Sequence, residues 1–293
     1  MPEVKIKIAD LNITASIEDN LIEHIPSNYI TKGCLNGVCR VCRCKLVSGQ
    51  VIENGKIINT PNIFLPCISK PLTDISIESH VGNFSIGSIK SVEYIDNSII
   101  EIKINVKKQF FTSKSIVNIF HNDYSISRSY SLVTMYKDGF NLLRIHVKLK
   151  ENGIFSNWFM TLKPDDQIKY QIINIPVPRY QEMSRYINII SAGSGMGAAL
   201  SRGIELSEKH ELDGINIVAI NRNNLSTYHE NCINDLKHHV NCGVHIRNVH
   251  FTDWIHHDIE KFIEKKFFTV SVGSTIITKK VVQLDEKEIE SFG

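Results

Sequence analysis

The sequence predicts a multidomain protein in which two β-rich segments are followed by an α/β segment. Residues 1–83 contain short alternating stretches around a cysteine-rich loop, and residues 84–182 continue with strand-like stretches and few helical ones. Residues 183–293 alternate buried-type strands with amphipathic helical stretches. A long series of strands is typical of a β-barrel, whereas strand–helix alternation is typical of a parallel α/β sheet. We therefore expect three domains with these boundaries.

Length and charge limit the possible functions. The 293 residues suffice for two or three domains, each with its own core. With 33 Lys and Arg against 31 Asp and Glu, the net charge of +2 argues against binding nucleic acid through bulk charge. No apolar run approaches the roughly 20 residues that a membrane-spanning helix requires. The first residues alternate as strands do and do not resemble a signal peptide. We expect a cytoplasmic protein without a membrane span.

The individual elements follow from local patterns. In the first segment, KLVSGQVIENGK predicts a strand, a turn at Ser48-Gly49 and another strand; Asp74–His80 is the last expected strand, and VGNFSIGS the expected linker. Five stretches predict strands in the second segment: SIIEIKINV, SIVNIFH, SRSYSLVT, LLRIHVKL and IKYQIINI. After Pro176 and Pro178, the third segment begins with a strand (YINIISAG), a glycine turn and a helix (AALSRGIELSEK), and continues with the strands INIVAI and FFTVSVGS.

The cysteines indicate a metal centre. An odd number, seven, in a chain without a recognisable signal argues against a disulfide framework. Four of them lie within eleven residues, in GCLNGVCRVCRCKL, and another follows in FLPCISKP. The spacing C-x4-C-x2-C with a distant fourth cysteine is the plant-type 2Fe–2S pattern. We expect the glycines of the loop, Gly33 and Gly37, to allow tight wrapping with φ > 0. The predicted ligands are Cys34, Cys39, Cys42 and Cys67.

Zinc and buried structural cysteines are the alternatives for this loop. Zinc sites usually pair two C-x2-4-C knuckles, whereas here one arm ends in a lone cysteine. We expect Cys44 not to be a ligand, and Cys232 and Cys242 to be small core residues. A possible second metal site would comprise His229, Cys232, His238, Cys242 and His245. This group lacks a tight knuckle turn, and its spacing suits a helix that runs into a strand, which argues against a zinc site there.

Together with the cluster motif, two further patterns carry a resemblance to a known family. They are Arg128-Ser129-Tyr130-Ser131 in SRSYSL and the turn Gly193-Ser194-Gly195-Met196-Gly197. Their order resembles the ferredoxin-NADP reductase superfamily, in particular reductase components of multicomponent oxygenases such as benzoate dioxygenase reductase. The chain is also similar to reductases of deoxysugar-forming dehydrases. The resemblance covers essentially the whole chain. It implies a β-grasp (α+β) ferredoxin-type domain at 1–83, an antiparallel β-barrel that binds FAD at 84–182, and an α/β parallel-sheet NAD(P)-binding domain at 183–293.

For the flavin, the resemblance implies two groups of contacts. In the R-x-Y-S motif, Tyr130 can stack on the isoalloxazine ring, Ser131 can hydrogen-bond its edge, and Arg128 offers a planar fork to the pyrophosphate. A second element matches HVKLKENGIFSNWF, whose turn would bring a helix N-terminus to the pyrophosphate. Ser156 is also a credible N-cap of that helix. The implied FAD-binding residues are Arg128, Ser129, Tyr130, Ser131, His146, Val147, Lys148, Gly153, Ile154, Phe155 and Ser156.

For the nicotinamide nucleotide, the resemblance implies three groups of contacts: the glycine turn, a basic residue, and a turn near the end of the chain. The glycines permit close approach of a phosphate to a helix N-terminus. No acidic residue closes the next strand, and Arg222 matches the basic residue of the family. Val272-Gly273-Ser274 replaces a C-G-P turn, so the family's cysteine is absent. The implied nucleotide-binding residues are Gly193, Ser194, Gly195, Met196, Gly197, Arg222 and Gly273.

The implied catalytic residues lie beside the reacting flavin. The resemblance assigns this role to Tyr130 and Ser131, and to Glu290 and Phe292 in an E-x-F tail. Two flavin-domain segments depart from the family: SKSIVNIF replaces a P-G-Q-like stretch, and NIPVPRY replaces a G-P-x-G-x-F turn. These departures predict a looser FAD site or an altered geometry.

The three motifs together predict a converter between two-electron and one-electron chemistry. A nicotinamide gives two electrons as hydride, a 2Fe–2S cluster accepts one at a time, and a flavin can do both. We expect an NAD(P)H-dependent iron–sulfur flavoprotein reductase that passes electrons to a partner oxygenase or dehydrase. The alternative is a ferredoxin-like carrier or redox-responsive binding module with degenerate flavin and nucleotide regions. NADH and NADPH both remain open as the donor.

Overall fold

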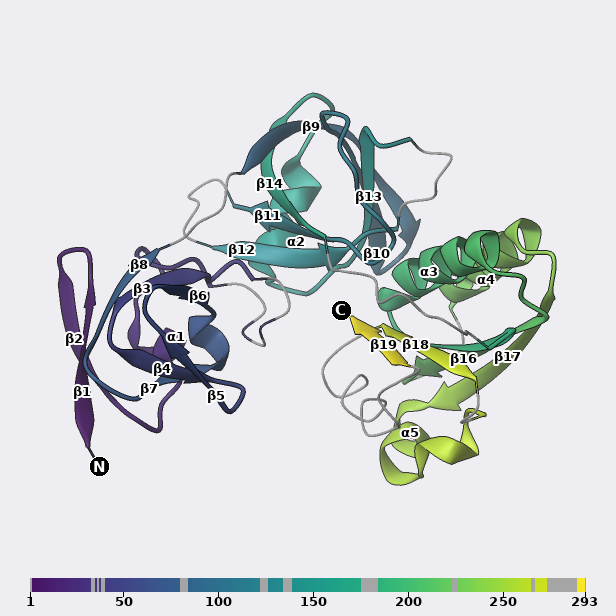
Figure 1. Cartoon of the computed structure of the whole chain (residues 1–293). Coiled ribbons are helices and arrows are strands. Elements are labelled where there is room, and N and C mark those ends of the chain that lie inside the picture. Colours follow the sequence, from purple (N-terminus) through teal and green to yellow (C-terminus); the bar gives the residue numbers. More distant parts are fainter. Residues whose placement is uncertain are drawn as a thin grey trace. The chain divides into compact units, whose positions relative to one another are not determined.

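A computed structural model describes the greater part of the chain. The described residues are 2–32, 35, 37, 40–79, 84–121, 126–133, 139–174, 184–222, 226–264, 267–272 and, as backbone only, 289–292. These residues form four sheets and few helices, as the sequence predicts (Figure 1). None of the described helices is long and apolar enough to cross a membrane.

The N-terminal part contains a five-stranded mixed sheet in the order β2-β1-β8-β3-β6 (Figure 1). β1 pairs parallel with β8, whereas β1 with β2 and β3 with β8 pair antiparallel. Alternation of exposed and buried residues along β1 turns Val4, Ile6 and Ile8 into the core, as expected for a half-buried strand. The strands are β1 (Glu3–Ile8), β2 (Leu11–Ser16), β3 (Cys44–Ser48), β6 (Asn62–Phe64) and β8 (Ile75–Ser79).

A three-stranded sheet, β5-β4-β7, and two short helices complete this part. The elements are α1 (Leu21–His24), β4 (Gln50–Glu53), β5 (Lys56–Asn59), the 3-10 helix η1 (Pro66–Ile68) and β7 (Ser69–Pro71). α1 lies against η1, β2 and β7. The predicted turn at Ser48-Gly49 is confirmed, because β3 ends at Ser48 and Gly49 has a φ of 85°.

The middle of the chain forms a six-stranded sheet in the order β12-β11-β14-β9-β10-β13 (Figure 1). Its elements are β9 (Ser85–Asp96), β10 (Ile99–Asn105), β11 (Ile116–Phe120), β12 (Ser127–Ser131), β13 (Leu142–Lys148), α2 (Ile154–Thr161) and β14 (Gln167–Ile173). All five predicted strands are present. The linker prediction was wrong for Ser85–Ser88, which begin β9, because Gly87 and Ile89 alternate into the core.

The C-terminal part is a parallel five-stranded sheet in the order β17-β16-β15-β18-β19 (Figure 1). Its elements are β15 (Tyr186–Ala192), α3 (Gly195–Lys209), β16 (Gly214–Asn221), α4 (Thr227–His239), β17 (Gly243–His250), α5 (Phe251–His256), η3 (Ile259–Lys261), β18 (Phe268–Val272) and β19 (Ile289–Phe292). Ile189 packs with residues of α3 and α4, whereas Ile190 packs with Trp254 and Phe262. Helices therefore cover both faces, and the central strands are hydrophobic along their length.

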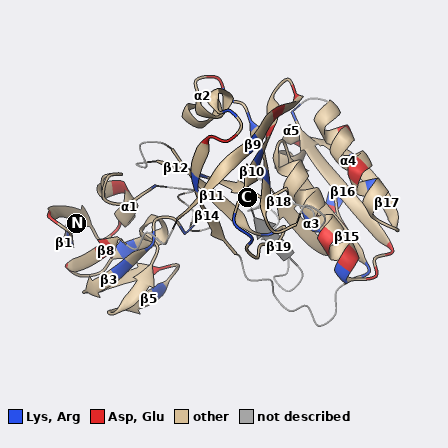
Figure 2. Ribbon diagram, turned by 90° about the horizontal axis from the view of Figure 1, so that it is seen from above, with Lys and Arg blue, Asp and Glu red and all other residues tan. Residues whose placement is uncertain are grey.

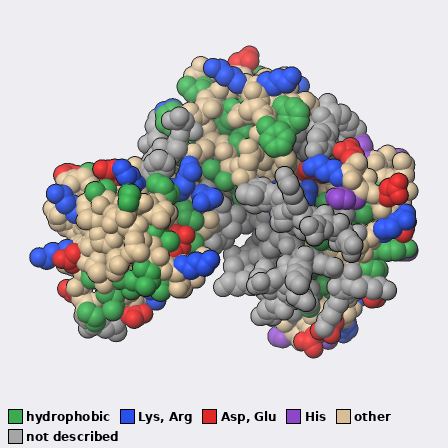
Figure 3. Space-filling model, in the orientation of Figure 1, with side chains coloured by type: hydrophobic (Ala, Val, Ile, Leu, Met, Phe, Trp, Pro, Cys, Tyr) green, Lys and Arg blue, Asp and Glu red, His purple; other side chains and the backbone are tan. Residues whose placement is uncertain are grey.

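By compactness, the chain divides into two units. One comprises 1–86, 117–129 and 168–173, and the other comprises 87–116, 130–167 and 174–293. The predicted domain boundaries, 83/84 and 182/183, touch residues outside the described part of the chain. Lys and Arg are interspersed with Asp and Glu along the ribbon and on the face drawn in space-filling form (Figures 2 and 3).

The Ser48-Gly49 turn allows a test of the fold. A Cβ at Gly49 would lie 2.2 Å from the Asp74 backbone oxygen, whereas at Gly55 (φ 79°) it would meet nothing within 4 Å. Gly55→Ala should therefore cost only the left-handed backbone penalty of about 1–2 kcal/mol. Gly49→Ala should cost clearly more, measured as the shift of the N-terminal unfolding transition in calorimetry. Equal shifts for the two variants would contradict this packing of the Gly49 turn against Asp74.

Candidate functional site

Two of the four predicted cluster ligands lie side by side. The Sγ atoms of Cys42 and Cys67 are 3.4 Å apart, and both residues are buried. This separation is too long for a disulfide of about 2.05 Å. It is close to the roughly 3.8 Å expected for two thiolates on one tetrahedral metal with bonds of about 2.3 Å. The pair fits a cluster, and Cys34 and Cys39 lie outside the described residues.

The described part of the cysteine loop is tightly wound. Gly37 has a φ of 82°, which confirms the predicted left-handed glycine, and Leu35 and Arg40 also have positive φ values of 61° and 53°. A Cβ at Gly37 would lie 2.8 Å from Cδ1 of Ile68, the residue after Cys67. Within the described residues, which do not include Cys34 and Cys39, no group of three or more His, Cys, Asp or Glu could hold a metal ion.

Cys44 and Cys232 lie in hydrophobic cores, and Cys242 is partly buried against one. Cys44, on β3, is fully buried, and its thiol lies 3.6 Å from the Cys42 carbonyl oxygen. Burial raises the pKa of the Cys232 thiol to about 12 and also raises the pKa of the Cys242 thiol. Cys232 therefore behaves as the small core residue that the sequence predicts. The segment around it is a helix, α4, that runs into β17.

The R-x-Y-S motif lies on β12, as predicted. Ser129 Oγ donates to Asn118 Oδ1 at 2.7 Å, and Arg128 Nη1 donates to the Ser127 carbonyl oxygen at 2.8 Å. The Tyr130 ring lies 5.7 Å from the ring of Phe159 on α2. Tyr130 and Ser131 are half-buried and Arg128 is exposed.

The predicted turn and helix after β13 are present as α2, but the N-cap assignment of Ser156 was wrong. The N-cap is Gly153, whose backbone is extended, and Ser156 is already inside the first turn. The Ser156 hydroxyl instead accepts a hydrogen bond from the Lys150 amide at 3.0 Å. This hydroxyl therefore supports the turn that leads into α2. Among the other predicted flavin residues, Phe155 is buried and Ile154 is exposed.

His146, on β13, makes contacts that the sequence does not reveal. Val147 points into the sheet core and Lys148 is exposed, whereas the His146 side chain is 7% exposed. Its Nδ1 lies 2.9 Å from the Tyr228 hydroxyl, and its Nε2 lies 3.4 Å from Glu101 Oε1. Burial lowers the pKa of His146, and the hydrogen bond and charge of Glu101 oppose that effect.

A charged network surrounds Glu101 on β10. Arg144 Nη2 approaches Glu101 Oε1 at 2.6 Å, and Lys103 Nζ approaches Oε2 at 3.0 Å and Glu93 at 3.1 Å. Burial would raise the pKa of Glu101, but the hydrogen bonds and charges of His146, Arg144 and Lys103 outweigh it and hold this pKa well below its ordinary value. The strand register explains why these charged side chains meet. Glu101 pairs with Glu93 and His146, and Lys103 pairs with Arg144.

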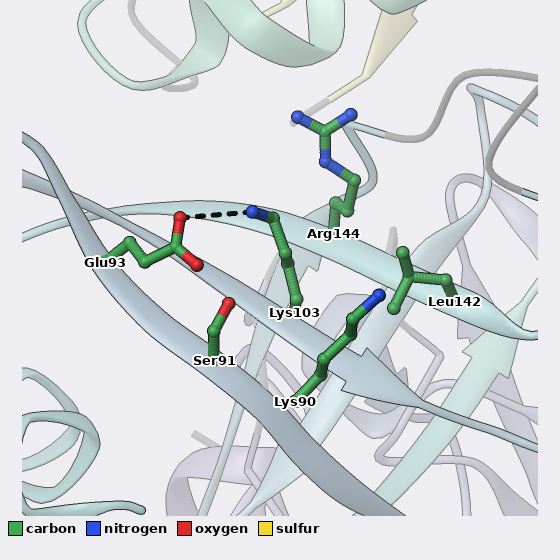
Figure 4. Close-up of a pocket in the computed structure, with 6 residues that line it drawn as sticks. All are labelled: Lys90, Ser91, Glu93, Lys103, Leu142 and Arg144. Atoms are coloured by element: carbon green, nitrogen blue, oxygen red, sulfur yellow. Dashed lines mark hydrogen bonds and ion pairs between the residues drawn. The ribbon is translucent and has the colours of Figure 1, made fainter. Parts of the chain in front are cut away.

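The outer side of this network opens on a pocket of about 440 Å³ (Figure 4). Three neighbouring strands, β9, β10 and β13, carry its cationic groups, and Figure 4 shows Lys103 turned toward Glu93. The lining residues are Lys90, Ser91, Glu93, Lys103, Leu142 and Arg144. On β10, Glu101 and Lys103 stand at alternate positions, which places them on one face of the strand, whereas the charged residues of β9 show no such recurrence.

The predicted glycine turn joins β15 to α3. Gly193 has a φ of 55°, in the left-handed region. Gly193, Ser194 and Gly195 are half-buried, whereas Met196 and Gly197 are buried. The Gly197 amide donates to the Tyr228 hydroxyl at 2.9 Å, and a Cβ at Gly197 would lie 2.3 Å from His146 Nδ1. Position 197 must therefore be glycine, because His146 leaves no room for a Cβ there.

Arg222 follows the carboxyl end of β16, at the edge where α/β folds bind ligands. It is exposed, and its guanidinium lies 5.5 Å from the centre of the Phe251 ring. The Arg222 carbonyl oxygen lies 2.6 Å from His250 Nε2. Gly273 is outside the described residues. Glu290 and Phe292 lie on β19, opposite Val270 and Val272, and only their backbone is described.

The Glu101 network predicts a loss of stability in acid. Because the pKa of Glu101 lies below its ordinary value of 4.5, its contribution is fully present above that pH and is lost as the pH falls below it. Glu101→Gln should cost about 2 kcal/mol at pH 7 and flatten the fall of Tm below pH 4.5, measured by calorimetry. Glu78→Gln, at an exposed pair with Lys45, is the control and should keep the slope of the wild type. Parallel slopes for Glu101→Gln and wild type would count against this network.

Comparison with known proteins identifies the fold. No protein-family model matches the chain, and no curated protein matches it at a significant level. The structure is similar to the ferredoxin reductase in carbazole 1,9a-dioxygenase, with a TM-score of 0.59 and 15% identity over 99% of this chain and 98% of that chain. A cytochrome P450 reductase from Amycolatopsis gives a TM-score of 0.62 and 14% identity over 98% of each chain.

A third solved structure is similar to the larger part of this chain. Phthalate dioxygenase reductase, described as modular for electron transfer from pyridine nucleotides to 2Fe–2S, gives a TM-score of 0.54 and 17% identity over 72% of this chain and 68% of that chain. The chain therefore has the multidomain, β-rich fold of these reductases, as the sequence predicts.

Proposed function

We propose that the chain is an NAD(P)H-dependent electron-transfer reductase, an enzyme that carries FAD and a 2Fe–2S cluster and supplies electrons to a partner protein. The observation that carries the proposal is the buried Cys42–Cys67 pair, with sulfurs 3.4 Å apart. The reductase-like fold supports it.

In this proposal the cluster belongs to a β-grasp, ferredoxin-type domain at residues 1–83. Cys34, Cys39, Cys42 and Cys67 are its ligands, and the cluster would accept one electron at a time. The chain contributes a preformed half of the site. Cys42 precedes β3 and Cys67 lies in η1, so two elements of one core bring the two sulfurs together. Their burial excludes water from this half of the site.

The flavin domain would span residues 84–182 and the nucleotide domain residues 183–293. Bound FAD would take hydride from the nicotinamide and release single electrons. On the protein side, the exposed Arg128 would bind the pyrophosphate, and the half-buried Tyr130 would stack on the flavin ring. The half-buried loop at Gly193–Gly195 and the exposed Arg222 would hold the nucleotide. Ser131, Glu290 and Phe292 complete the proposed catalytic set.

The proposed partner is an oxygenase or a deoxysugar dehydrase in the cytoplasm. Two of the similar structures belong to dioxygenase systems and one is a P450 reductase. Docking of such a partner requires only a small and transient interface.

A ferredoxin-like carrier or redox-responsive binding module is the second candidate. Several residues predicted to contact the flavin already use their polar atoms in bonds within the chain, and this favours the second candidate. Ser129 is bonded to Asn118, Ser156 to the Lys150 amide and His146 to Tyr228. Such a protein would contain iron and sulfide but would not be reduced by NADH or NADPH.

Cysteine variants test the cluster. Cys42→Ser and Cys67→Ser should each abolish the iron–sulfur absorbance and the acid-labile sulfide of the anaerobically purified protein, because each removes a ligand. They should also abolish reduction of cytochrome c while sparing direct reduction of ferricyanide by the flavin. Cys44→Ala is the matched control, since Cys44 is buried next to the pair. A cluster that survives Cys42→Ser, or disappears with Cys44→Ala, would refute the ligand assignment.

Flavin content separates the two candidate functions. The reductase should retain FAD near one equivalent per chain, and NADH or NADPH should bleach it under anaerobic conditions. Protein with a full complement of iron and sulfide but no FAD, even after incubation with added FAD, would exclude the reductase and favour the carrier.

A further inference from the structure

We propose that Tyr228 and His146 are positioning residues for the nicotinamide nucleotide. They hold the Gly193–Gly197 turn from its buried side and confine the nucleotide's phosphates to Gly193, Ser194 and Gly195. This inference rests on the proposed function of the turn, but the hydrogen bonds that carry it belong to the chain itself.

Tyr228 joins the two ends of the turn. It lies in the first turn of α4 and is fully buried. Its hydroxyl accepts from the Gly197 amide at 2.9 Å and donates to the Ser194 carbonyl oxygen at 3.2 Å. Gly197 is the third residue of α3, so this amide is one of the four that the helix leaves without an internal partner. Tyr228 therefore occupies a donor that helix N-termini commonly offer to phosphates.

Two amides of the turn are already bonded, and this restricts where a phosphate can bind. The Met196 amide is bonded to the Gly193 carbonyl oxygen at 3.2 Å, and Met196 and Gly197 are buried. The half-buried residues Gly193, Ser194 and Gly195 are the part of the turn that remains accessible. A phosphate that approaches α3 thus meets the first half of the turn, whose conformation depends on the bonds of Tyr228.

His146 fixes Tyr228 from the opposite side. Its Nδ1 lies 2.9 Å from the Tyr228 hydroxyl, and the two rings meet edge to face with centroids 5.4 Å apart. Glu101 holds the other ring nitrogen, and Arg144 and Lys103 hold Glu101. The absence of a side chain at Gly197 is what admits the imidazole, because a Cβ there would lie 2.3 Å from Nδ1. The strand β13 and the turn are thereby joined through a continuous polar chain.

A count of hydrogens shows how His146 acts on the turn. The Tyr228 hydroxyl has one hydrogen. It can be accepted by the Ser194 carbonyl oxygen, by an unprotonated Nδ1 or by the sulfur of Cys232, which also lies within hydrogen-bond reach. When both ring nitrogens carry a hydrogen, Nε2 donates to Glu101, Nδ1 donates to Tyr228, and the hydroxyl hydrogen stays on Ser194. When the hydrogen is on Nε2, facing Glu101, the Tyr228 hydroxyl turns to Nδ1 and releases Ser194. A donor at the Nδ1 position therefore favours the ordered turn.

Three variants and a control test the proposal. Tyr228→Phe keeps the ring and removes the hydroxyl, His146→Leu removes the ring nitrogens, and His146→Asn keeps an amide donor near the Nδ1 position. Tyr186→Phe, at a half-exposed tyrosine of the same sheet, is the control. For each variant we would measure hydrogen exchange of the Gly193–Gly197 amides without nucleotide, the Kd values of NAD⁺ and NADP⁺ by calorimetry, and kcat and KM with the reduced coenzymes.

We expect Tyr228→Phe and His146→Leu to speed exchange of the turn and to raise Kd and KM by about tenfold each, the factor that corresponds to one lost buried hydrogen bond. At saturating coenzyme, kcat per bound FAD should change less than KM. His146→Asn should recover most of the loss. The Tyr186→Phe control should match wild type.

Two results would overturn the proposal. The first is hydrogen exchange of the Gly193–Gly197 amides at the wild-type rate in Tyr228→Phe. The second is faster exchange in that variant with unchanged Kd values for both coenzymes. If Tyr228→Phe fails to fold, the difference between His146→Leu and His146→Asn decides in its place, and equal Kd values for those two would reject positioning. Wild-type protein that binds neither coenzyme would instead reject the proposed function, while the exchange data would still report on the hydrogen bonds.

Discussion

The contact on which this account depends is the approach of two buried sulfur atoms, Cys42 Sγ and Cys67 Sγ, to 3.4 Å. The two residues lie 25 positions apart and come from the turn just before β3 and from η1. They share a hydrophobic core with Cys44, so the packing of the N-terminal strands sets the distance between them. A cluster bound there would gain two ligands without a further rearrangement of β3 or η1, and a buried site would limit its contact with solvent.

A second polar system orders the part of the chain that would handle the nucleotide. Glu101, His146, Tyr228 and the Gly197 amide form a connected series. It begins beside Arg144 and Lys103, which line the pocket of Figure 4, and it ends at the glycine turn. Buried polar groups of this kind are costly unless every member has a partner, and once paired they specify one arrangement. The same series explains why position 197 is glycine, because a Cβ there would lie 2.3 Å from His146 Nδ1.

Local patterns predicted the elements well and the long-range contacts poorly. The turn at Gly49, the helix α3 and the strands of the six-stranded sheet follow from alternation, turn residues and helical periodicity. The proximity of Cys42 and Cys67 was foreseeable, because their spacing matches the plant-type 2Fe–2S pattern, in which the four cysteines converge. In contrast, His146 and Tyr228 are 82 positions apart, and no short-range signal joins them. The N-cap assignment of Ser156 failed because Gly153, three residues earlier, takes the extended conformation that starts α2.

The most direct measurement for the central claim is electron paramagnetic resonance of the anaerobically purified protein after addition of NADH or NADPH. We expect the signal of a singly reduced 2Fe–2S cluster, formed with the nicotinamide nucleotide as the only reductant. A protein that contains iron and sulfide and gives this signal with dithionite, yet stays silent with both nucleotides in the presence of FAD, would rule out the proposed electron path. The absence of an iron–sulfur signal even with dithionite would rule out the cluster itself.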